Sequence, residues 1–129
     1  MVLARTLRVL VVDDQESMRS LLRSFLIKLN FETIGEAASG NAALVELNTR
    51  LYSLVISDFN MEDGSGLDLL NAMRAHAVLK KVPVIMVTGD SKKATVMSVM
   101  SAGVDAYLVK PVSLEAVRSR IAKVLGPLN

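Results

Sequence analysis

The segment Arg8–Asp14, which reads RVLVVDD, predicts a buried strand that ends in two carboxylates. Its apolar residues Val9–Val12 occupy consecutive positions, which is typical of a strand covered on both faces. A strand followed by an amphipathic helix indicates the first unit of an alternating β/α fold. Helical spacing does follow, in the apolar residues Met18, Leu21, Leu22, Phe25 and Leu29.

The same alternation continues along the chain. Short segments rich in β-branched residues recur at Thr33–Ala37, Leu54–Ser57, Val84–Val87 and Tyr107–Val109. Helices are expected at Ala42–Thr49, Gly66–Met73 and Lys92–Ser101, and around Leu114, Val117, Ile121 and Val124. Strict alternation of five strands and five helices predicts the α/β class, with a doubly wound parallel sheet between helices.

Residues that favour helix ends support this division. Ser91 and Ser113 are expected to cap the last two helices at their N-termini. Gly103 is expected to end the fourth helix, and Gly126-Pro127 the fifth.

The composition excludes several classes of protein. The 129 residues suit one domain, expected to span residues 1–129 with a core of about residues 7–125. The net charge is +2, and the basic doublets Lys80-Lys81 and Lys92-Lys93 have no interleaved aromatic residues, which argues against a nucleic-acid partner. The absence of Cys excludes disulfides, thiolate zinc sites and a cysteine nucleophile. The apolar runs fall short of the ~20 residues that span a bilayer, so we expect a cytoplasmic monomer without membrane attachment.

Polar side chains stand where the predicted strands end. The first, third, fourth and fifth strands are followed by Asp13-Asp14, Asp58, Thr88 and Lys110. The second strand, which ends near Glu36, offers no obvious ligand. Because ligands bind beyond the carboxyl ends of parallel strands, the four groups are expected to converge on one edge. Three carboxylates repel one another, and Mg²⁺ is a cation that suits their oxygens.

This set of groups suits the chemistry of phosphate transfer. An aspartate beside a divalent cation can attack a phosphoryl group and form an aspartyl phosphate. The transferred group carries negative charge, which Lys110 offsets with a charged donor and Thr88 with a neutral one. The strand ends therefore predict a phosphate-receiving site.

Separated motifs in this order carry a resemblance to a known family: Asp13-Asp14, Asp58 within Ser57–Met61, Thr88-Gly89 and Lys110-Pro111. Over roughly residues 7–125 the chain resembles the receiver domains of two-component response regulators, of the small CheY-like type. The resemblance implies a flavodoxin-like sheet with strand order 2-1-3-4-5. In that order the first and third strands are neighbours, which places their acids side by side.

The resemblance also implies a role for each site residue. Asp58 would be the phosphoacceptor, taking its phosphoryl group from the phosphohistidine of a histidine kinase. Mg²⁺ would be held by Asp14, by Asp13 largely through water, by Asp58 and by the backbone carbonyl of Asn60. Lys110 would pair with Asp58 and then with the phosphate. Such a domain is a switch rather than an enzyme.

The same resemblance implies how the signal leaves the site. Thr88 would move to hydrogen-bond a phosphate oxygen, and Tyr107 would swing into the space that it leaves. This movement would remodel the face of the fourth helix, fifth strand and fifth helix, where partners commonly dock and which Met97 and Met100 border. Chemotaxis, with a flagellar motor switch protein as target, is the commonest role of CheY-like proteins.

Several positions depart from the family pattern or tune it. Glu62, followed by Asp63, stands where Pro is common, and Val112 stands where an aromatic residue usually follows Lys-Pro. Asn60 and Asp90 resemble the residues of members whose phosphorylated state decays quickly.

Other interpretations stay open. The chain could be a phosphorelay intermediate, a phosphate sink, or a receiver cut from a larger transcriptional regulator. A Mg²⁺-dependent phosphohydrolase also uses an aspartate nucleophile, but it typically needs a second acid two residues later, where this chain has Asn60. His76, the only histidine, is expected to be a solvated surface residue rather than a phosphoryl carrier.

Overall fold

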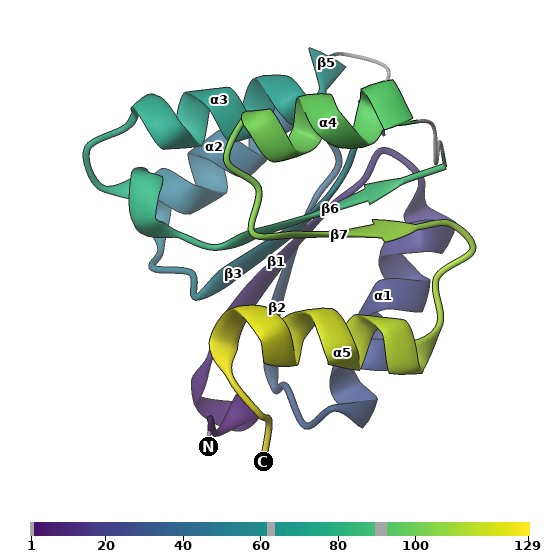
Figure 1. Ribbon diagram of the computed structural model, residues 1–129. Helices are drawn as coiled ribbons and strands as arrows, with labels where there is room; N and C mark the ends of the chain where they lie inside the picture. Colours follow the sequence, from purple (N-terminus) through teal and green to yellow (C-terminus); the bar gives the residue numbers. More distant parts are fainter. Residues whose placement is uncertain (1, 62–63, 90–92) are drawn as a thin grey trace.

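The computed structural model describes residues 2–61, 64–89 and 93–129, and a parallel sheet lies at its centre (Figure 1). Within these residues the sheet has five strands: β1 (Arg8–Val12), β2 (Thr33–Ala37), β3 (Leu54–Asp58), β6 (Val84–Thr88) and β7 (Ala106–Val109). Their order is β2-β1-β3-β6-β7, and every neighbouring pair is parallel. Counting only these strands, the order is 2-1-3-4-5, which confirms the predicted fold.

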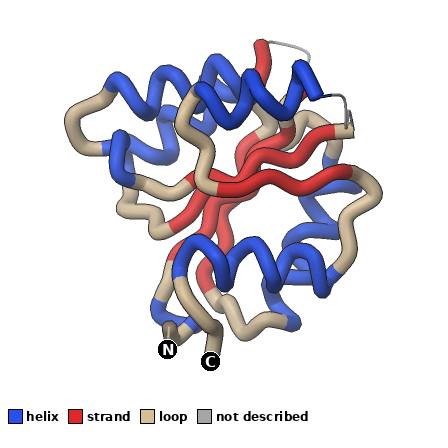
Figure 2. The backbone as a smooth tube through the Cα atoms, in the orientation of Figure 1, coloured by secondary structure: helices blue, strands red, loops and turns tan. Residues whose placement is uncertain are grey.

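Helices cover both faces of the sheet. On one face lie α1 (Glu16–Lys28) and α5 (Leu114–Leu125), and on the other lie α2 (Gly40–Thr49), α3 (Gly66–Ala75) and α4 (Lys93–Ser101) (Figures 1 and 2). Short elements join them: the 3-10 turns η1 (Ala4–Thr6) and η2 (Leu79–Lys81) and the antiparallel pair β4 (Asn60–Met61) and β5 (Gly64–Ser65). Sequence patterns did not predict these short elements, because two or three residues show no periodicity.

Consecutive apolar residues of each strand divide between two cores. In β1, Val9 and Val11 pack in a cluster with residues of α1 and α5, whereas Leu10 and Val12 pack in a second cluster with residues of α2 and α3. All four are fully buried, because successive side chains of a strand point to opposite faces and helices cover each face here. Full burial of each such side chain contributes about 1.5–3 kcal/mol.

The ends of the helices agree with the sequence signals where the structure describes them. The Ser113 hydroxyl accepts a hydrogen bond from the Ala116 amide and caps α5. Gly103 and Gly126 adopt φ of 92° and 98°, a region that favours glycine, just after α4 and α5. The predicted cap Ser91 lies outside the described residues. Among the helices that are described, none is both long enough and apolar enough to cross a membrane.

Candidate functional site

The sheet register places Asp13 and Asp58 side by side at the carboxyl edge. Val12 of β1 is paired with Ser57 of β3, so the next residue along each strand is an aspartate. Asp13 continues the ladder, because its amide donates to the Ala37 carbonyl at 3.1 Å. Two acids far apart in the sequence are thus brought together by strand order alone.

Thr88 and Lys110 reach the same edge from β6 and β7. Thr88 is the last residue of β6, and its carbonyl accepts the Lys110 amide at 2.8 Å. The Lys110 side chain turns toward β3, where its Nζ lies 3.0 Å from Oδ1 of Asp58. The Lys110-Pro111 peptide that follows is cis, and Val112 packs at the margin of the core on the α1–α5 face.

Three carboxylates meet at this point. Asp13, Asp14 and Asp58 each offer an oxygen, and these oxygens all lie within 4.8 Å of one another. Asp13 and Asp58 are buried, with 1% and 5% of their surface exposed, while Asp14 is half-buried. Like charges at this separation repel strongly when water is excluded, so the cluster favours a bound cation.

Burial raises the pKa of Asp13 above its usual range, because the desolvated carboxylate loses contact with water. A hydrogen bond from the Gln15 amide to Oδ1 at 2.9 Å opposes this rise in pKa. The charges of Asp58 and Asp14 raise the pKa further, and the Lys110 ammonium lowers it.

Burial likewise raises the pKa of Asp58. The hydrogen bond and charge of Lys110 act in the opposite direction, followed by the Phe59 amide, while repulsion from Asp14 adds to the rise in pKa. Asp58 is therefore a desolvated carboxylate held by one ammonium group. Such a carboxylate is less hydrated than one in bulk water and is well placed to act as a nucleophile.

A cleft of about 450 Å³ opens over the cluster, lined by Asp14, Gln15, Asp58, Asn60, Met61, Gly89 and Lys110. Four of the predicted site residues therefore share one cleft. Asp13 and Thr88 are buried and are not among the described residues that line the cleft. A ligand in the cleft would meet Asp58 and Lys110 directly.

The donor set of the cluster fits a hard divalent cation. Carboxylate and carbonyl oxygens are the ligands that Mg²⁺ prefers, and Mg²⁺ commonly keeps several waters, which an open cleft allows. Asp13, Asp14 and Asp58 supply the carboxylates, and Asn60 lines the same cleft. The residues present therefore suit the metal that the sequence predicts.

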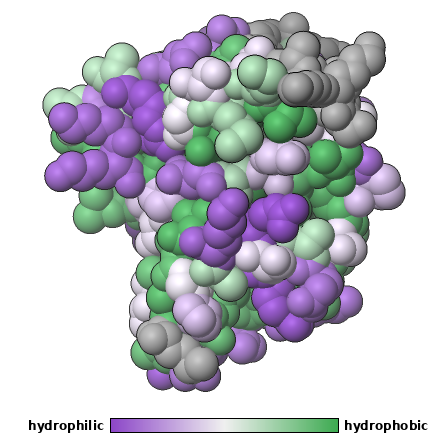
Figure 3. Space-filling view, viewed as in Figure 1, coloured by the Kyte–Doolittle hydropathy of each residue, from purple (hydrophilic) through white to green (hydrophobic). Residues whose placement is uncertain are grey.

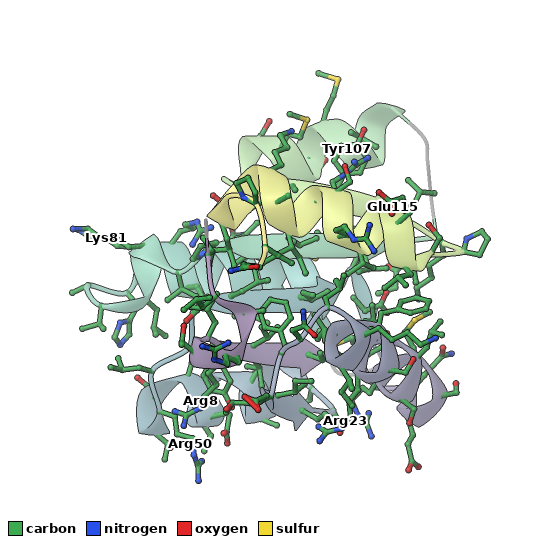
Figure 4. The ribbon with its side chains drawn as sticks, turned by 90° about the horizontal axis from the view of Figure 1, so that it is seen from below. Arg8, Arg23, Arg50, Lys81, Tyr107 and Glu115 are labelled. Atoms are coloured by element: carbon green, nitrogen blue, oxygen red, sulfur yellow. The ribbon has the colours of Figure 1, made fainter. Side chains whose placement is uncertain are left out.

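Thr88 and Tyr107 lie on neighbouring strands. Thr88 is buried and is paired in the ladder with Val109, whereas Tyr107 is half-buried and is paired with Met86 two positions earlier. The Tyr107 carbonyl accepts a hydrogen bond from Arg120 of α5 at 2.9 Å. The backbone of Tyr107 is therefore tied to α5, and Figure 4 shows the residue between α4 and α5.

Sequence reasoning missed a residue that shapes the site. Gly66 begins α3, its amide donates to the Phe59 carbonyl at 2.7 Å, and a Cβ there would overlap the Asp58 carbonyl oxygen. Its signal in the sequence was a glycine at the first position of a helical pattern. The departures Glu62, Asp63 and Asp90, as well as Lys92, lie outside the described residues.

Comparisons with known proteins agree on one family. The family model described as the response regulator receiver domain matches residues 9–122. The chemotaxis protein CheY of Pseudomonas aeruginosa is 35% identical over 123 residues, which cover 95% of this chain and 99% of that protein. Chemotaxis protein CheY-3 of Vibrio cholerae is 33% identical, covering 98% of both chains. The crystal structure of Vibrio cholerae chemotaxis protein CheY4 superposes with a TM-score of 0.86 at 28% identity, covering 92% of this chain and 98% of the other.

Proposed function

The chain belongs to the response regulator receiver domain family, and on that premise we propose that Asp58 accepts a phosphoryl group from the phosphohistidine of a histidine kinase. The observation that carries this proposal is the 3.0 Å ion pair of Asp58 with Lys110 inside a cluster of three carboxylates. A single buried acid with a cationic partner would be explained equally well by a purely structural role. Three acids with one lysine at a cleft serve phosphate chemistry better than they serve stability.

In the proposed reaction a carboxylate oxygen of Asp58 attacks phosphorus. The new O–P bond forms as the N–P bond of phosphohistidine breaks, and the bonding electrons return to the imidazole nitrogen, which then takes up a proton. Lys110 offsets the negative charge on the transferred group from its position beside Oδ1. The Thr88 hydroxyl is the proposed neutral donor to a phosphoryl oxygen.

We propose Mg²⁺ as the cofactor, held by Asp13, Asp14, Asp58 and the backbone carbonyl of Asn60. When bound, it supplies the positive charge that lets a phosphate approach three carboxylates. The supporting observation is the spacing of the three carboxylates, whose oxygens lie within 4.8 Å of one another.

The output of the switch is proposed to leave through the face of α4, β7 and α5. Met97 and Met100 of α4 and Val109 of β7 are exposed there, and methionine suits an adaptable contact surface. Figure 3, which views this face, shows apolar residues interspersed with hydrophilic ones. Thr88 and Tyr107 would couple the site to this face. Because two relatives are named chemotaxis proteins, we propose a chemotaxis target such as a flagellar motor switch protein.

We further propose that residues 1–129 act as one receiver domain and as a switch, in line with the family, whose members are switch proteins rather than classical enzymes. The family model covers residues 9–122 of this length. A phosphorelay role uses the same chemistry at Asp58 and would differ only in the acceptor that follows.

Acid-labile labelling from acetyl phosphate with Mg²⁺ tests the role of Asp58. We expect the parent protein to take up one phosphoryl group per chain and Asp58→Asn to take up none, because the amide is not a nucleophile. Asp68→Asn on the exposed side of α3 is the matched control and should label as the parent does. Label retained in Asp58→Asn would overturn the assignment, and many turnovers of a small phosphoester per chain would favour a phosphohydrolase.

A further inference from the structure

Arg19 joins three elements around the acidic cluster. It lies in the first turn of α1, and only 16% of its side chain is exposed. Its Nη1 donates to the backbone carbonyl of Asp13 at 2.5 Å, and its Nε donates to Oε1 of Glu36 on β2 at 3.2 Å. One guanidinium therefore ties α1 and β2 to the loop that carries the acids.

The carbonyl that Arg19 holds belongs to the peptide between Asp13 and Asp14. Because a peptide unit is planar, fixing that oxygen also fixes the direction of the Asp14 amide and the place of the Cα that carries its side chain. Asp13 is fixed as well, since its amide donates to Ala37 and its Oδ1 accepts from the Gln15 amide. The hydrogen bond from Arg19 thus restrains the link between two of the clustered carboxylates.

Glu36 orients the guanidinium. It lies opposite Val11 in the β1–β2 register, and its second oxygen, Oε2, lies 3.7 Å from Nη1 of Arg23 one helical turn along. A planar guanidinium presents its donors in a rigid fork and so serves two acceptors in a set geometry, whereas the ammonium of a lysine is a compact charge on a flexible stem. The second strand, which offered no obvious ligand in the sequence, therefore supports the site through Glu36.

Arg23 supplies the contrast within the same structure. It also faces Glu36, but its Nη1 donates to the Ile34 carbonyl rather than to the loop, and 44% of its side chain is exposed. The two arginines share a helix, a carboxylate partner and a charge. They differ in whether they touch the Asp13–Asp14 peptide.

We propose that Arg19 is a positioning residue of the receiver reaction, holding the Asp13–Asp14 peptide so that both carboxylates keep the spacing that a divalent cation requires. The inference rests on the proposed function, because it assigns the purpose of the restraint to metal binding. A restraint of this kind acts through the groups it orients, as the partners behind metal ligands do.

Isothermal titration calorimetry with MgCl₂ tests the proposal by measuring the Mg²⁺ affinity of Arg19→Gln. Arg23→Gln is the matched control. We expect the Mg²⁺ dissociation constant of Arg19→Gln to rise about tenfold and that of Arg23→Gln to stay near the parent value. Arg19→Lys should resemble Arg19→Gln, since an ammonium lacks the rigid planar fork with which the guanidinium reaches both acceptors. Amide hydrogen exchange of Asp14 without metal should be faster in Arg19→Gln alone.

The outcomes distinguish failure of the positioning role of Arg19 from failure of the proposed function. Unchanged Mg²⁺ affinity in Arg19→Gln, or equal losses of affinity in both variants, would overturn the positioning role, because then the arginines matter only for stability or charge. Should Arg19→Gln fail to fold by circular dichroism, Glu36→Gln provides the second test and should weaken Mg²⁺ binding in the same direction by a smaller factor. A parent protein that binds no Mg²⁺ and takes no label from acetyl phosphate would overturn the proposed function itself.

Discussion

The polar groups at the two edges of the sheet, where the parallel strands begin (the amino edge) and where they end (the carboxyl edge), are arranged in opposite ways. At the amino edge the Tyr52 hydroxyl donates to Oε1 of Glu46 at 2.7 Å, and Nη1 of Arg50 lies 3.0 Å from the same oxygen. The Arg8 guanidinium lies 5.8 Å from the centre of the Tyr52 ring. Figure 4 shows Arg8 and Arg50 at the same end of the molecule. At the carboxyl edge, by contrast, three acids lie close together and one of them, Asp58, pairs with Lys110.

The pKa values follow this contrast. At the amino edge the Tyr52 hydrogen bond lowers the pKa of Glu46, and burial with the nearby carboxylate raises the pKa of Tyr52 to about 12. Both groups therefore keep their normal charge state at neutral pH. At the carboxyl edge burial raises the pKa values of Asp13 and Asp58. The groups at the amino edge thus stabilise one another as they stand, whereas the carboxyl edge holds desolvated carboxylates that a bound cation would stabilise.

The largest expected effect is that of Gly66→Ala at the carboxyl edge. The new Cβ would overlap the Asp58 carbonyl oxygen and lie 2.7 Å from Sδ of Met86, so backbone must move. We expect a loss of about 3 kcal/mol in the free energy of unfolding, measured by urea denaturation, together with weakened Mg²⁺ binding. Gly40→Ala, at the first residue of α2, is the control, because its Cβ would be an ordinary 3.8 Å from Leu69. Equal effects of the two substitutions would contradict the steric account.

Gly35→Ala is expected to have the second largest effect on stability and to disturb the amino edge alone. Its Cβ would overlap the Tyr52 hydroxyl, which must then leave Glu46. We expect a loss of about 2 kcal/mol in the free energy of unfolding, with Mg²⁺ affinity unchanged. The Tyr52→Phe background removes the overlapping oxygen, so Gly35→Ala should cost clearly less there. Strictly additive losses in the double variant would show that the hydroxyl is not the obstacle.

The smallest expected effect is a gain in the free energy of unfolding, whereas the two glycine substitutions are expected to lower it. Asp13→Asn keeps an oxygen for the Gln15 amide but removes one charge from the cluster. Without metal at pH 7, we expect its free energy of unfolding to exceed that of the parent by about 1 kcal/mol. Adding Mg²⁺ should reverse the order, because the parent gains more from binding.

The pH dependence of the free energy of unfolding, compared between the parent protein and Asp13→Asn, tests whether repulsion and desolvation cause this difference. A carboxyl group whose pKa is raised by folding stabilises the folded state below its unfolded value of 3.8, and this contribution is lost as pH rises through the folded pKa. Metal-free parent protein should therefore lose stability relative to Asp13→Asn as pH rises from about 4 toward neutrality. A constant difference between the two proteins over that range would be evidence against repulsion and desolvation as the cause.

Local patterns predicted the elements well because local physics creates them. The run Val9–Val12 became the interior strand β1, and the helical spacing after Met18 became α1. The chemistry at the strand ends was also readable, since Asp58 and Lys110 follow buried strands and carry charge. Contacts between distant residues left no such pattern. Neither Arg19 nor Glu36 shows a periodic signal that links it to Asp13.

His76 illustrates the limit of local reading. It was predicted as a solvated surface residue, yet it is half-buried, and its Nδ1 accepts hydrogen bonds from the Val78 and Leu79 amides at 3.1 and 3.2 Å. The imidazole therefore caps the turn that leads into η2. A histidine at the end of a helical pattern gives no sign of whether its ring faces water or the backbone of the next turn.

The order of apolar and polar residues by itself determined the α/β alternation, the two-sided burial of the strands and the kind of chemistry at their ends, because each depends on neighbours a few residues away. Only the tertiary structure decided which charges meet. It placed Asp13 beside Asp58 and Lys110 against Asp58, which the sequence implied only through its resemblance to a family, and it brought Arg19 against the Asp13 carbonyl, which nothing in the sequence indicated. Electrostatic interaction depends on distance in space, and that distance exists only once the strands are ordered and the helices are packed.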